Sequence, residues 1–554
     1  MSSPRFTSVL LVLTILICAA AGKKTPSKPA DLASHPPKEK KNDPSHALFS
    51  TNAPIHTFKI EVSGNELAAL QKDNRSYVHG TVTVGATVLK DVAIHLKGNG
   101  SFRPLNEKPS LVIKFDRFVP GQKLFGETKI ALNNSSQDGT YLADFMANEM
   151  FREANVPVSR VTHARVLFNG RDLGLYVLVE MHNKEFLKRW FHNAQGNLYE
   201  AYIADVDSTM DLDNGVDKSQ ADRKKLVEVL NLPDPAARWA RLPQVLDVDR
   251  YLSHLVCELF IGHTDGYAMN RNNYRIYHNP DTDRFTFLAH GADWAFQNTG
   301  VSMQPPQNSL VTRAVLTTPE GARLFKERRL TLFTNVFQLD DLTNRVNCVG
   351  ARLLTVARNA NETNDFRRVV AEMNQHLVAR WQNLTNQLYG PPPLPLKFDA
   401  AGLARLEGWR MKTDPMSPPA LHERLTNANH RTLHISTVTN ATVNAGTVAS
   451  WRTRVLLPPG IYLFEGDLRG TGIVSRTNVT DIGFGAGLRV SGDKLRENML
   501  LGTAPWTHLQ HRLTNAVEDS VELVCELRAL RGEVWFDEDS LRLVKQPPPV
   551  PGSK

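Results

Sequence analysis

Cysteine is scarce in this chain, with only four among 554 residues. Domains that depend on disulfides are much richer in cysteine, so an apolar core must hold this fold together. Hydrophobic residues make up 41% of the chain, which is enough for such a core at this length. Beyond the N-terminal segment, Cys257, Cys348 and Cys525 form no close pair along the chain, and we expect all three to be buried free thiols.

Long apolar runs are almost absent as well. The one pronounced run covers residues 9–17, after Arg5 and just before Ala19–Ala21. It is too short for a membrane span of about 20 residues. Residues 1–21 are therefore predicted to be a cleaved signal peptide, and the protein to be exported to the periplasm, the cell surface or the medium. The alternative is a lipoprotein acylated at Cys18. We expect no membrane span elsewhere.

The chain also lacks a strong excess of one charge. Its net charge is +8, but residues 23–45 hold six lysines against three acidic residues. The rest of the chain beyond Arg5 carries only about +4, which is too even for a dedicated nucleic-acid binder. No nucleic-acid partner is expected.

Proline and lysine mark the boundaries between folded regions. Residues 22–51 and 391–399 are predicted to be linkers, the first disordered and basic and the second stiffened by proline. A short disordered tail is expected at 547–554. Two folded domains are then predicted, at 52–390 and 400–546.

The first domain is predicted to be of the α+β class. Alternating patterns indicate strands in its front half, and amphipathic patterns indicate helices in its back half. A strand-rich lobe followed by a helical lobe is typical of a bilobal phosphotransferase. The predicted strands are 55–62, 77–84, 92–97, 111–115, 164–169 and 173–180; the predicted helices are 138–153, 249–261, 318–336, 339–360 and 363–388, with one hairpin near 273–290.

The second domain has short strands separated by turns, which predicts an antiparallel β-sandwich of the jelly-roll kind. It resembles galactose-binding-like and carbohydrate-binding domains, through Trp451, the strand 460–466 and the segment 532–537. Trp451, Trp506 and Trp535 are either sugar-stacking faces or core residues.

A dense polar segment, residues 263–274, carries the strongest chemical signal. Asp265 and Asn270 have the spacing of the aspartate and asparagine in a kinase catalytic loop, and Asp293 follows the next hairpin. Phosphoryl transfer needs one aspartate near the attacking hydroxyl, and an asparagine and a second aspartate for Mg²⁺. The alternatives are turn-forming residues without chemistry, or a zinc hydrolase site built from His263, His290 and the two aspartates.

Several motifs in order resemble the CotH family, the atypical protein kinases named after spore-coat protein H. The resemblance covers about 55–388. The segments that carry it are Lys97–Ser101, Lys108–Phe115, Asn169–Glu180, Gly196–Tyr199, Asp265, Asn272–Tyr274 and Asp293.

The resemblance implies ATP and Mg²⁺ as cofactors and a protein as substrate. Asp265 would then be the catalytic base, and Asp293 would hold the metal together with Asn270 or Asn273. The nucleotide would be bound by Lys108, Lys97, Gly98 and Gly100. Glu149 and Glu180 are both candidates for an ion pair with Lys108.

The chain departs from the family pattern at three positions. Gly291 stands where the family often has an acidic residue, Lys97 replaces an arginine, and Glu200 stands where some members have lysine. The predicted function is an exported kinase that phosphorylates Ser or Thr of a secreted or surface protein. The alternative is a catalytically degenerate adhesion protein whose sandwich binds glycans, which Gly291 and the scarcity of ATP outside cells favour.

Overall fold

The computed structural model describes residues 42–547, except 217, 394, 415–416, 428–429, 439–445, 476–484 and 492–497. The predicted signal peptide, most of the first linker and nearly all of the predicted tail lie outside the described residues. No described helix is long and apolar enough to span a membrane. The linker was predicted to extend to residue 51, which is wrong: α1 (His46–Phe49) is folded, and Leu48 is fully buried against the first strands.

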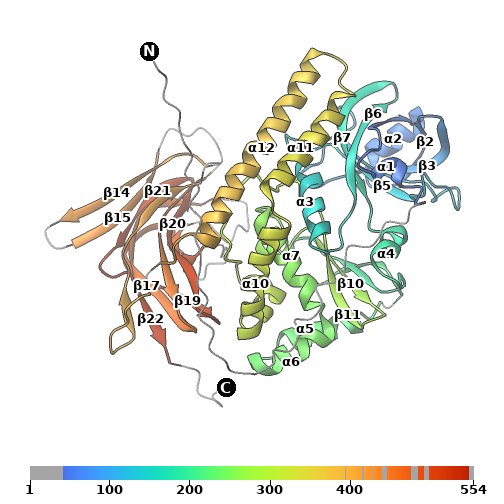
Figure 1. The fold of residues 1–554 in the computed structure, drawn as a ribbon. Coiled ribbons are helices and arrows are strands. Elements are labelled where there is room, and N and C mark those ends of the chain that lie inside the picture. Colours follow the sequence, from blue (N-terminus) through green and yellow to red (C-terminus); the bar gives the residue numbers. More distant parts are fainter. Residues whose placement is uncertain are drawn as a thin grey trace, which may run out of the picture. The chain divides into compact units, whose positions relative to one another are not determined.

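The N-terminal part of the first domain is a closed barrel of seven strands, drawn in blue to teal in Figure 1. Its order is β1-β2-β3-β4-β5-β7-β6, and the parallel pairing of β1 with β6 closes it. Alternate side chains such as Phe58, Ile94 and Leu132 point inward and are fully buried, which explains the alternating sequence pattern. The strands are β1 (His56–Glu61), β2 (Val78–Val84), β3 (Thr87–Lys97), β4 (Ser110–Lys114), β5 (Lys129–Asn133), β6 (Val161–Phe168) and β7 (Arg171–Glu180), with α2 (Gly64–Lys72) between β1 and β2.

The back of this domain is mostly helical, as predicted, but the single hairpin expected there is part of a four-stranded sheet. Its order is β11-β10-β8-β9. Two of its strands have only three and four residues, too few to show a periodic pattern. The elements are α3 (Ala143–Glu153), α4 (Lys184–Trp190), β8 (Leu198–Glu200), β9 (Asp211–Asn214), α5 (Ala221–Leu230), α6 (Pro235–Val245), α7 (Val248–Phe260), α8 (Tyr267–Asn270), β10 (Tyr274–Asn279), β11 (Arg284–Ala289), α9 (Leu310–Leu316), α10 (Pro319–Asn335), α11 (Leu339–Leu354) and α12 (Ala360–Tyr389).

The long helices α11 and α12 lie side by side (Figure 1). Helix α11 ends at Leu354, six residues earlier than predicted, and Asn359 begins α12 by accepting a hydrogen bond from the Glu362 amide. Of the three cysteines, Cys257 and Cys525 are buried, but Cys348 on α11 is exposed, so that part of the thiol prediction is wrong.

Arg380 on α12 is fully buried and joins three segments of the domain. Its guanidinium donates to the carbonyl oxygens of Phe260 at 2.9 Å, Thr299 at 2.9 Å and Val301 at 2.7 Å. The Phe260 carbonyl lies at the end of α7, immediately before the segment that leads to Asp265. Arg380 therefore fixes the helix end from which the polar loop begins.

Arg380→Met should lower the free energy of unfolding by about 3 kcal/mol, because it leaves several buried carbonyl groups without donors. Urea unfolding of the full chain measures this change. The control is Arg368→Met on the same helix, whose side chain is 61% exposed and should change stability by less than about 0.5 kcal/mol. Equal effects of the two substitutions would contradict this role of Arg380.

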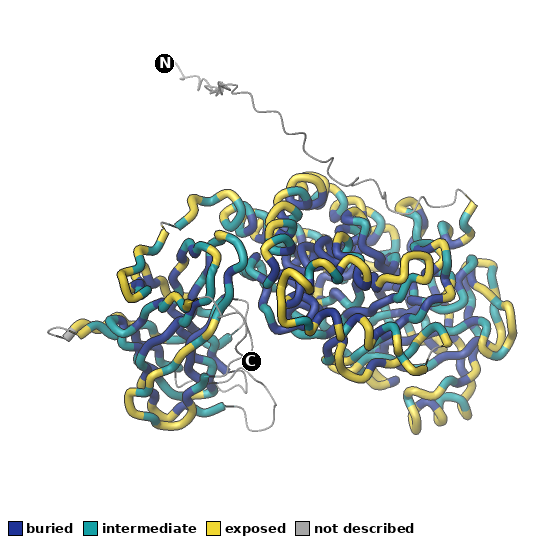
Figure 2. Tube along the Cα trace, turned by 90° about the horizontal axis from the view of Figure 1, so that it is seen from below, coloured by how far each residue is buried: buried dark blue, intermediate teal, exposed yellow. Residues whose placement is uncertain are grey.

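Two antiparallel sheets form the second domain around one apolar core, and its buried segments run through its interior (Figure 2). One sheet has the order β12-β22-β17-β21-β15-β14, with β19 paired to β17, and the other has the order β13-β16-β20-β18. The strands are β12 (Leu403–Arg405), β13 (Arg410–Thr413), β14 (Ala420–Asn427), β15 (His430–Thr437), β16 (Thr447–Leu457), β17 (Gly460–Val474), β18 (Gly485–Val490), β19 (Gly502–Asn515), β20 (Asp519–Ala529), β21 (Arg531–Asp537) and β22 (Arg542–Gln546).

The three tryptophans of this domain differ in exposure. Trp451 belongs to the core and donates its indole N–H to the His434 carbonyl at 3.1 Å. Trp535 is half-buried, and Trp506 is 42% exposed. Trp451 is thus a core residue, whereas Trp506 presents an aromatic face to solvent.

Candidate active site

A cavity of about 530 Å³ lies where β3, β5 and β7 of the barrel meet α3 and the loops after α7 and β11. It gathers most of the residues that the sequence singled out, although they come from widely separated segments. Lys97, Gly98, Gly100, Asp265, Asn273 and Asp293 line it. Of the predicted site residues, Lys108 and Asn270 do not.

Asp265 is held by three asparagine side chains. Its Oδ2 accepts from Asn272 Nδ2 at 3.1 Å and from Asn273 Nδ2 at 2.9 Å, and its Oδ1 accepts from Asn270 Nδ2 at 2.5 Å. Asn270 therefore positions Asp265 from outside the cavity. Of the two asparagines considered as metal ligands, only Asn273 lines the cavity.

A buried glutamate on α7 explains why the loop around Asp265 folds as it does. The Glu258 carboxyl group accepts from the backbone amides of Tyr267 at 2.7 Å and Ala268 at 3.0 Å, which anchors the start of α8. The Tyr267 hydroxyl in turn donates to Asp205 at 2.7 Å. Burial raises the pKa of Glu258 to about 8, although the two amide donors oppose that shift. Asp265 thus lies two residues before a backbone segment that Glu258 holds in place.

Lys97 lies among carboxylates in the cavity. Its Nζ donates to Asn133 Oδ1 at 2.8 Å. Burial lowers its pKa, and the negative charges of Asp144, Asp293 and Glu200 oppose this shift. Lys97 is therefore the lysine positioned to meet an anionic ligand.

Lys108 has a different environment. Its Nζ donates to the Tyr141 hydroxyl at 2.9 Å and lies 4.7 Å and 5.0 Å from the ring centres of Tyr141 and Tyr176. Burial lowers its pKa to about 8. The structure does not bring it to the predicted phosphate site.

Neither glutamate considered for Lys108 pairs with it. Glu149 accepts from Arg152 at 3.2 Å, and Glu180 accepts from Arg160 at 3.3 Å. The predicted ion pair of Lys108 with Glu149 or Glu180 is therefore wrong.

Asp144 on α3 is a site residue that sequence reasoning missed. It lines the cavity and accepts from the Ala292 amide at 2.8 Å, next to Asp293. An aspartate in the first turn of a helix is usually explained by its interaction with the helix dipole. The sequence therefore offers no reason to assign Asp144 to the site. Burial raises the pKa of Asp144 to about 6 and that of Asp293 to about 7; the Asp144 charge adds to the second shift, and Lys97 opposes both.

The charges of the cavity suit a hard divalent cation. Asp144, Asp211, Asp265 and Asp293 line it, against the single lysine Lys97. Glu200 also lines it but is already paired with Arg275 at 2.6 Å. Burial and nearby cations hold the pKa of His290 well below its usual value, so this histidine adds no positive charge. A polyphosphate would be repelled here unless a cation bridged it to the carboxylates. The oxygen-rich donor set fits Mg²⁺.

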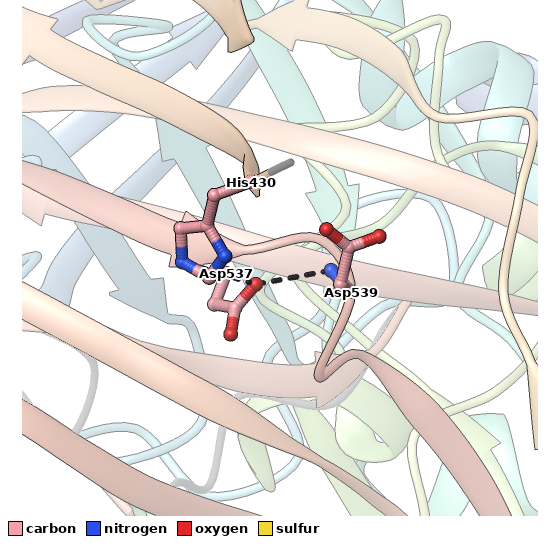
Figure 3. A group of neighbouring side chains, drawn as sticks. All are labelled: His430, Asp537 and Asp539. Carbon is pink, nitrogen blue, oxygen red and sulfur yellow. Dashed lines mark hydrogen bonds and ion pairs between the residues drawn. The ribbon is translucent and has the colours of Figure 1, made fainter. Parts of the chain in front are cut away.

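The structure does not bring together the residues of the alternative zinc site. His263 is buried and does not line the cavity. Among the described residues, one group of three potential metal ligands comes together, and it lies in the sandwich: His430, Asp537 and Asp539 (Figure 3). There Asp539 already pairs with Arg431 at 2.7 Å, and its amide donates to Asp537 at 3.1 Å.

Gly291 cannot be replaced simply by the acidic residue of the family pattern. Its φ is +57°, and a Cβ atom would lie 2.7 Å from Asn273 Oδ1. The glycine therefore allows Asn273 to reach Asp265. Asp144 supplies a second buried carboxylate to the cavity from another element.

Gly291→Asp should lower the free energy of unfolding by about 1–3 kcal/mol and should not tighten metal binding. Gly291→Ala should cost a similar amount, because the clash begins at Cβ. Thermal unfolding and Mg²⁺ titration of both variants test this expectation. A stable Gly291→Asp protein that binds Mg²⁺ more tightly than the parent would contradict it.

Comparison with known families settles the relationship suggested by the motifs. The family model described as "CotH kinase protein" matches residues 94–388, which is more than half of the chain. The chain belongs to the CotH kinase family. The predicted family is thus confirmed, and the match includes the candidate site from Lys97 to Asp293.

Two similar solved structures are distant. The Helicobacter pylori proinflammatory kinase CtkA shares 8% identity over 48% of this chain and 93% of its own, with a TM-score of 0.24. TmCBM61, solved in complex with β-1,4-galactotriose, shares 14% identity over 26% of this chain and 91% of its own, with a TM-score of 0.18. These scores are too low to support an argument. A comparison with curated proteins gave no match.

Proposed function

We propose that this CotH family member is a Mg²⁺-dependent protein kinase that transfers the γ-phosphate of ATP to a Ser or Thr hydroxyl. The observation that carries the proposal is the cavity in which Asp265, Asp293, Asp144 and Lys97 meet. In this proposal the barrel and the helical part act as the two lobes of a kinase, with ATP bound between them.

Each charged group has a distinct role in the proposal. Asp265 orients the substrate hydroxyl and accepts its proton, since its carboxylate is held by asparagine amides and forms no ion pair with any residue that the structure describes. Asp293 and Asp144 would hold Mg²⁺, with Asn273 beside them. When bound, Mg²⁺ would neutralise phosphate charge. Lys97 contacts the phosphates, and the backbone at Gly98 and Gly100 lines the same end of the cavity.

Calorimetric titration of the full chain with ATP, with and without Mg²⁺, tests the proposed ligand. We expect binding in the presence of Mg²⁺ and little without it, because the aspartates of the cavity outnumber Lys97 and otherwise repel the triphosphate. Equal binding without any divalent cation would contradict the electrostatic argument. The absence of binding under both conditions would favour a degenerate kinase domain.

We also propose that the protein is exported and that its substrate is a secreted or surface protein. The support is the apolar run at 9–17, followed by small residues. N-terminal sequencing of the mature protein tests this proposal, with Gly22 as the expected first residue. A mature protein that keeps Met1 would contradict it.

A second candidate function, glycan binding by the sandwich, is favoured by a row of side chains across its larger sheet. Arg469 lies 4.4 Å from the Trp535 ring centre and 5.5 Å from that of Trp506, and His434 stacks on Trp535 at 4.6 Å. Neighbours along the strands, such as Leu468, point into the core, so the row faces outward. An exposed indole face beside polar groups suits stacking on a sugar ring.

Trp506→Ala should remove most of the retardation of the protein in gels that contain a polysaccharide it binds, because the exposed indole supplies the stacking surface. A panel of soluble polysaccharides is used as the probe. The control is Leu421→Ala on β14, another exposed apolar side chain, which should leave the retardation unchanged. Unchanged retardation of Trp506→Ala, or no retardation of the parent by any polysaccharide, would contradict glycan binding at this row.

A further inference from the structure

Asn148 is a buried side chain in the cavity with an unused acceptor. It lies one helical turn after Asp144 on α3 and is only 6% exposed. Its Nδ2 donates to the Ser159 carbonyl at 3.0 Å, which fixes the orientation of the amide. Its Oδ1 is buried and has no hydrogen-bond partner. Among the residues that line the cavity, all of which the structure describes, no other buried side-chain atom is unpartnered.

An unpaired buried acceptor is costly, so such an atom in a binding cavity points to a donor supplied by a ligand. The oxygens of ionised phosphate groups accept hydrogen bonds and do not donate them, so phosphates cannot satisfy Asn148 Oδ1. The donor expected at Asn148 is therefore a group from a different part of the ligand.

The surroundings of Asn148 differ from those of Lys97. Along β7, Val177 pairs in register with Asn133, the partner of Lys97, and Val179 and Met181 follow at every second position farther along the chain. All three apolar residues line the cavity. At about 3.3 Å per residue, Met181 lies roughly 13 Å along the strand from Val177. Val179 and Met181 therefore lie progressively farther from Lys97 along β7, and they form the apolar end of the cavity.

Asn148 belongs to the apolar end. Its partner Ser159 precedes Arg160, whose carbonyl accepts from the Glu180 amide at 3.0 Å. Glu180 is followed directly by Met181. A nucleotide has the same division, with charged phosphates at one end and a flat, largely apolar base with a polar edge at the other.

We propose that Asn148 reads the nucleotide base: its Oδ1 accepts a hydrogen bond from the exocyclic amino group of adenine. This inference rests on the proposed kinase function and adds a specificity residue to it. A base with a carbonyl group at the same position would face Asn148 Oδ1 with a second acceptor, which is repulsive. The site should therefore prefer ATP to inosine triphosphate.

The experiment compares ligands first, because the parent protein then needs no substitution. Calorimetry of the full chain with Mg²⁺ measures the affinities for ATP, purine riboside triphosphate, which lacks the amino group, and inosine triphosphate. We expect ATP to bind about tenfold more tightly than purine riboside triphosphate, and inosine triphosphate to bind more weakly still. Asn148→Leu, checked by thermal unfolding, should bind ATP and purine riboside triphosphate equally.

The outcomes separate the two proposals. If the parent binds ATP and purine riboside triphosphate equally, only water occupies the Asn148 acceptor, and the inference is overturned while nucleotide binding stands. If Asn148→Leu folds and keeps the tenfold preference, another group reads the base, and the inference is again overturned. If the parent binds no nucleotide at all, the kinase proposal falls, and the base-reading role falls with it.

Discussion

Asp293→Asn should weaken Mg²⁺-dependent ATP binding by at least about 100-fold, since a neutral amide cannot replace a carboxylate that holds a divalent cation. The same substitution should make the protein more stable at pH 8. Burial and the Asp144 charge raise the pKa of Asp293 to about 7 in the folded chain, against about 3.9 in the unfolded chain. The parent therefore loses stability as the pH rises from about 4 through 7, and the asparagine variant does not lose this contribution.

Two measurements check this prediction, calorimetry for ATP with Mg²⁺ and urea unfolding at pH 4 and pH 8. We expect a gain on the order of 2 kcal/mol at pH 8 and little change at pH 4. Asp365→Asn is the control, because its carboxylate lies on α12 and is 67% exposed. Parental ATP affinity in Asp293→Asn, or a loss of stability at pH 8, would remove Asp293 from the metal site.

Asp265→Asn should leave the affinity for ATP and Mg²⁺ near the parental value and reduce phosphate transfer by about 10²- to 10⁴-fold. The variant loses the proton acceptor but keeps the shape of the side chain. Its carbonyl oxygen can still accept from Asn272 and Asn273, while the amide of Asn270 can turn to present its oxygen to the new NH₂ group. The loop should therefore stay folded.

Steady-state transfer and nucleotide affinity, measured on the same preparation, separate a catalytic role of Asp265 from a structural one. Asn270→Ser is a useful companion, because Asn270 supports Asp265 from outside the cavity. We expect this variant to lose less activity than Asp265→Asn. Parental transfer by Asp265→Asn would show that Asp265 is not the base.

The site residues that could be predicted from the sequence are those that lie close together along the chain, within one motif. Asp265 and Asn273 lie just before one hairpin and Asp293 lies just after it, so their proximity could be inferred from spacing. Lys97 was predicted from the family motif, and it also lines the cavity.

The residues that were missed depend on contacts between distant segments. Asp144 reaches the cavity because its helix packs against the loop at Ala292, which no local pattern reveals. Asn148 follows from the same packing. Lys108 does not line the cavity, because it lies against tyrosines far along the chain, Tyr141 and Tyr176.

Secondary structure could be predicted where an element is long enough to show a hydrophobic period. Six of the seven barrel strands and the long helices were predicted from their periodicity. The five-residue strand β5 was missed, and β8 and β9 are too short to show a period. Leu48 was missed because a four-residue helix within a polar segment resembles a linker.

Transfer of the γ-phosphate from labelled ATP is the most direct test of the proposed function. The full chain is incubated with ATP, Mg²⁺ and a mixture of secreted proteins, beside Asp265→Asn under identical conditions. The account predicts label on protein Ser or Thr with the parent and a loss of at least about 100-fold with the variant. A parent that binds ATP but transfers no phosphate, to itself or to any added protein and with any divalent cation, would contradict the account.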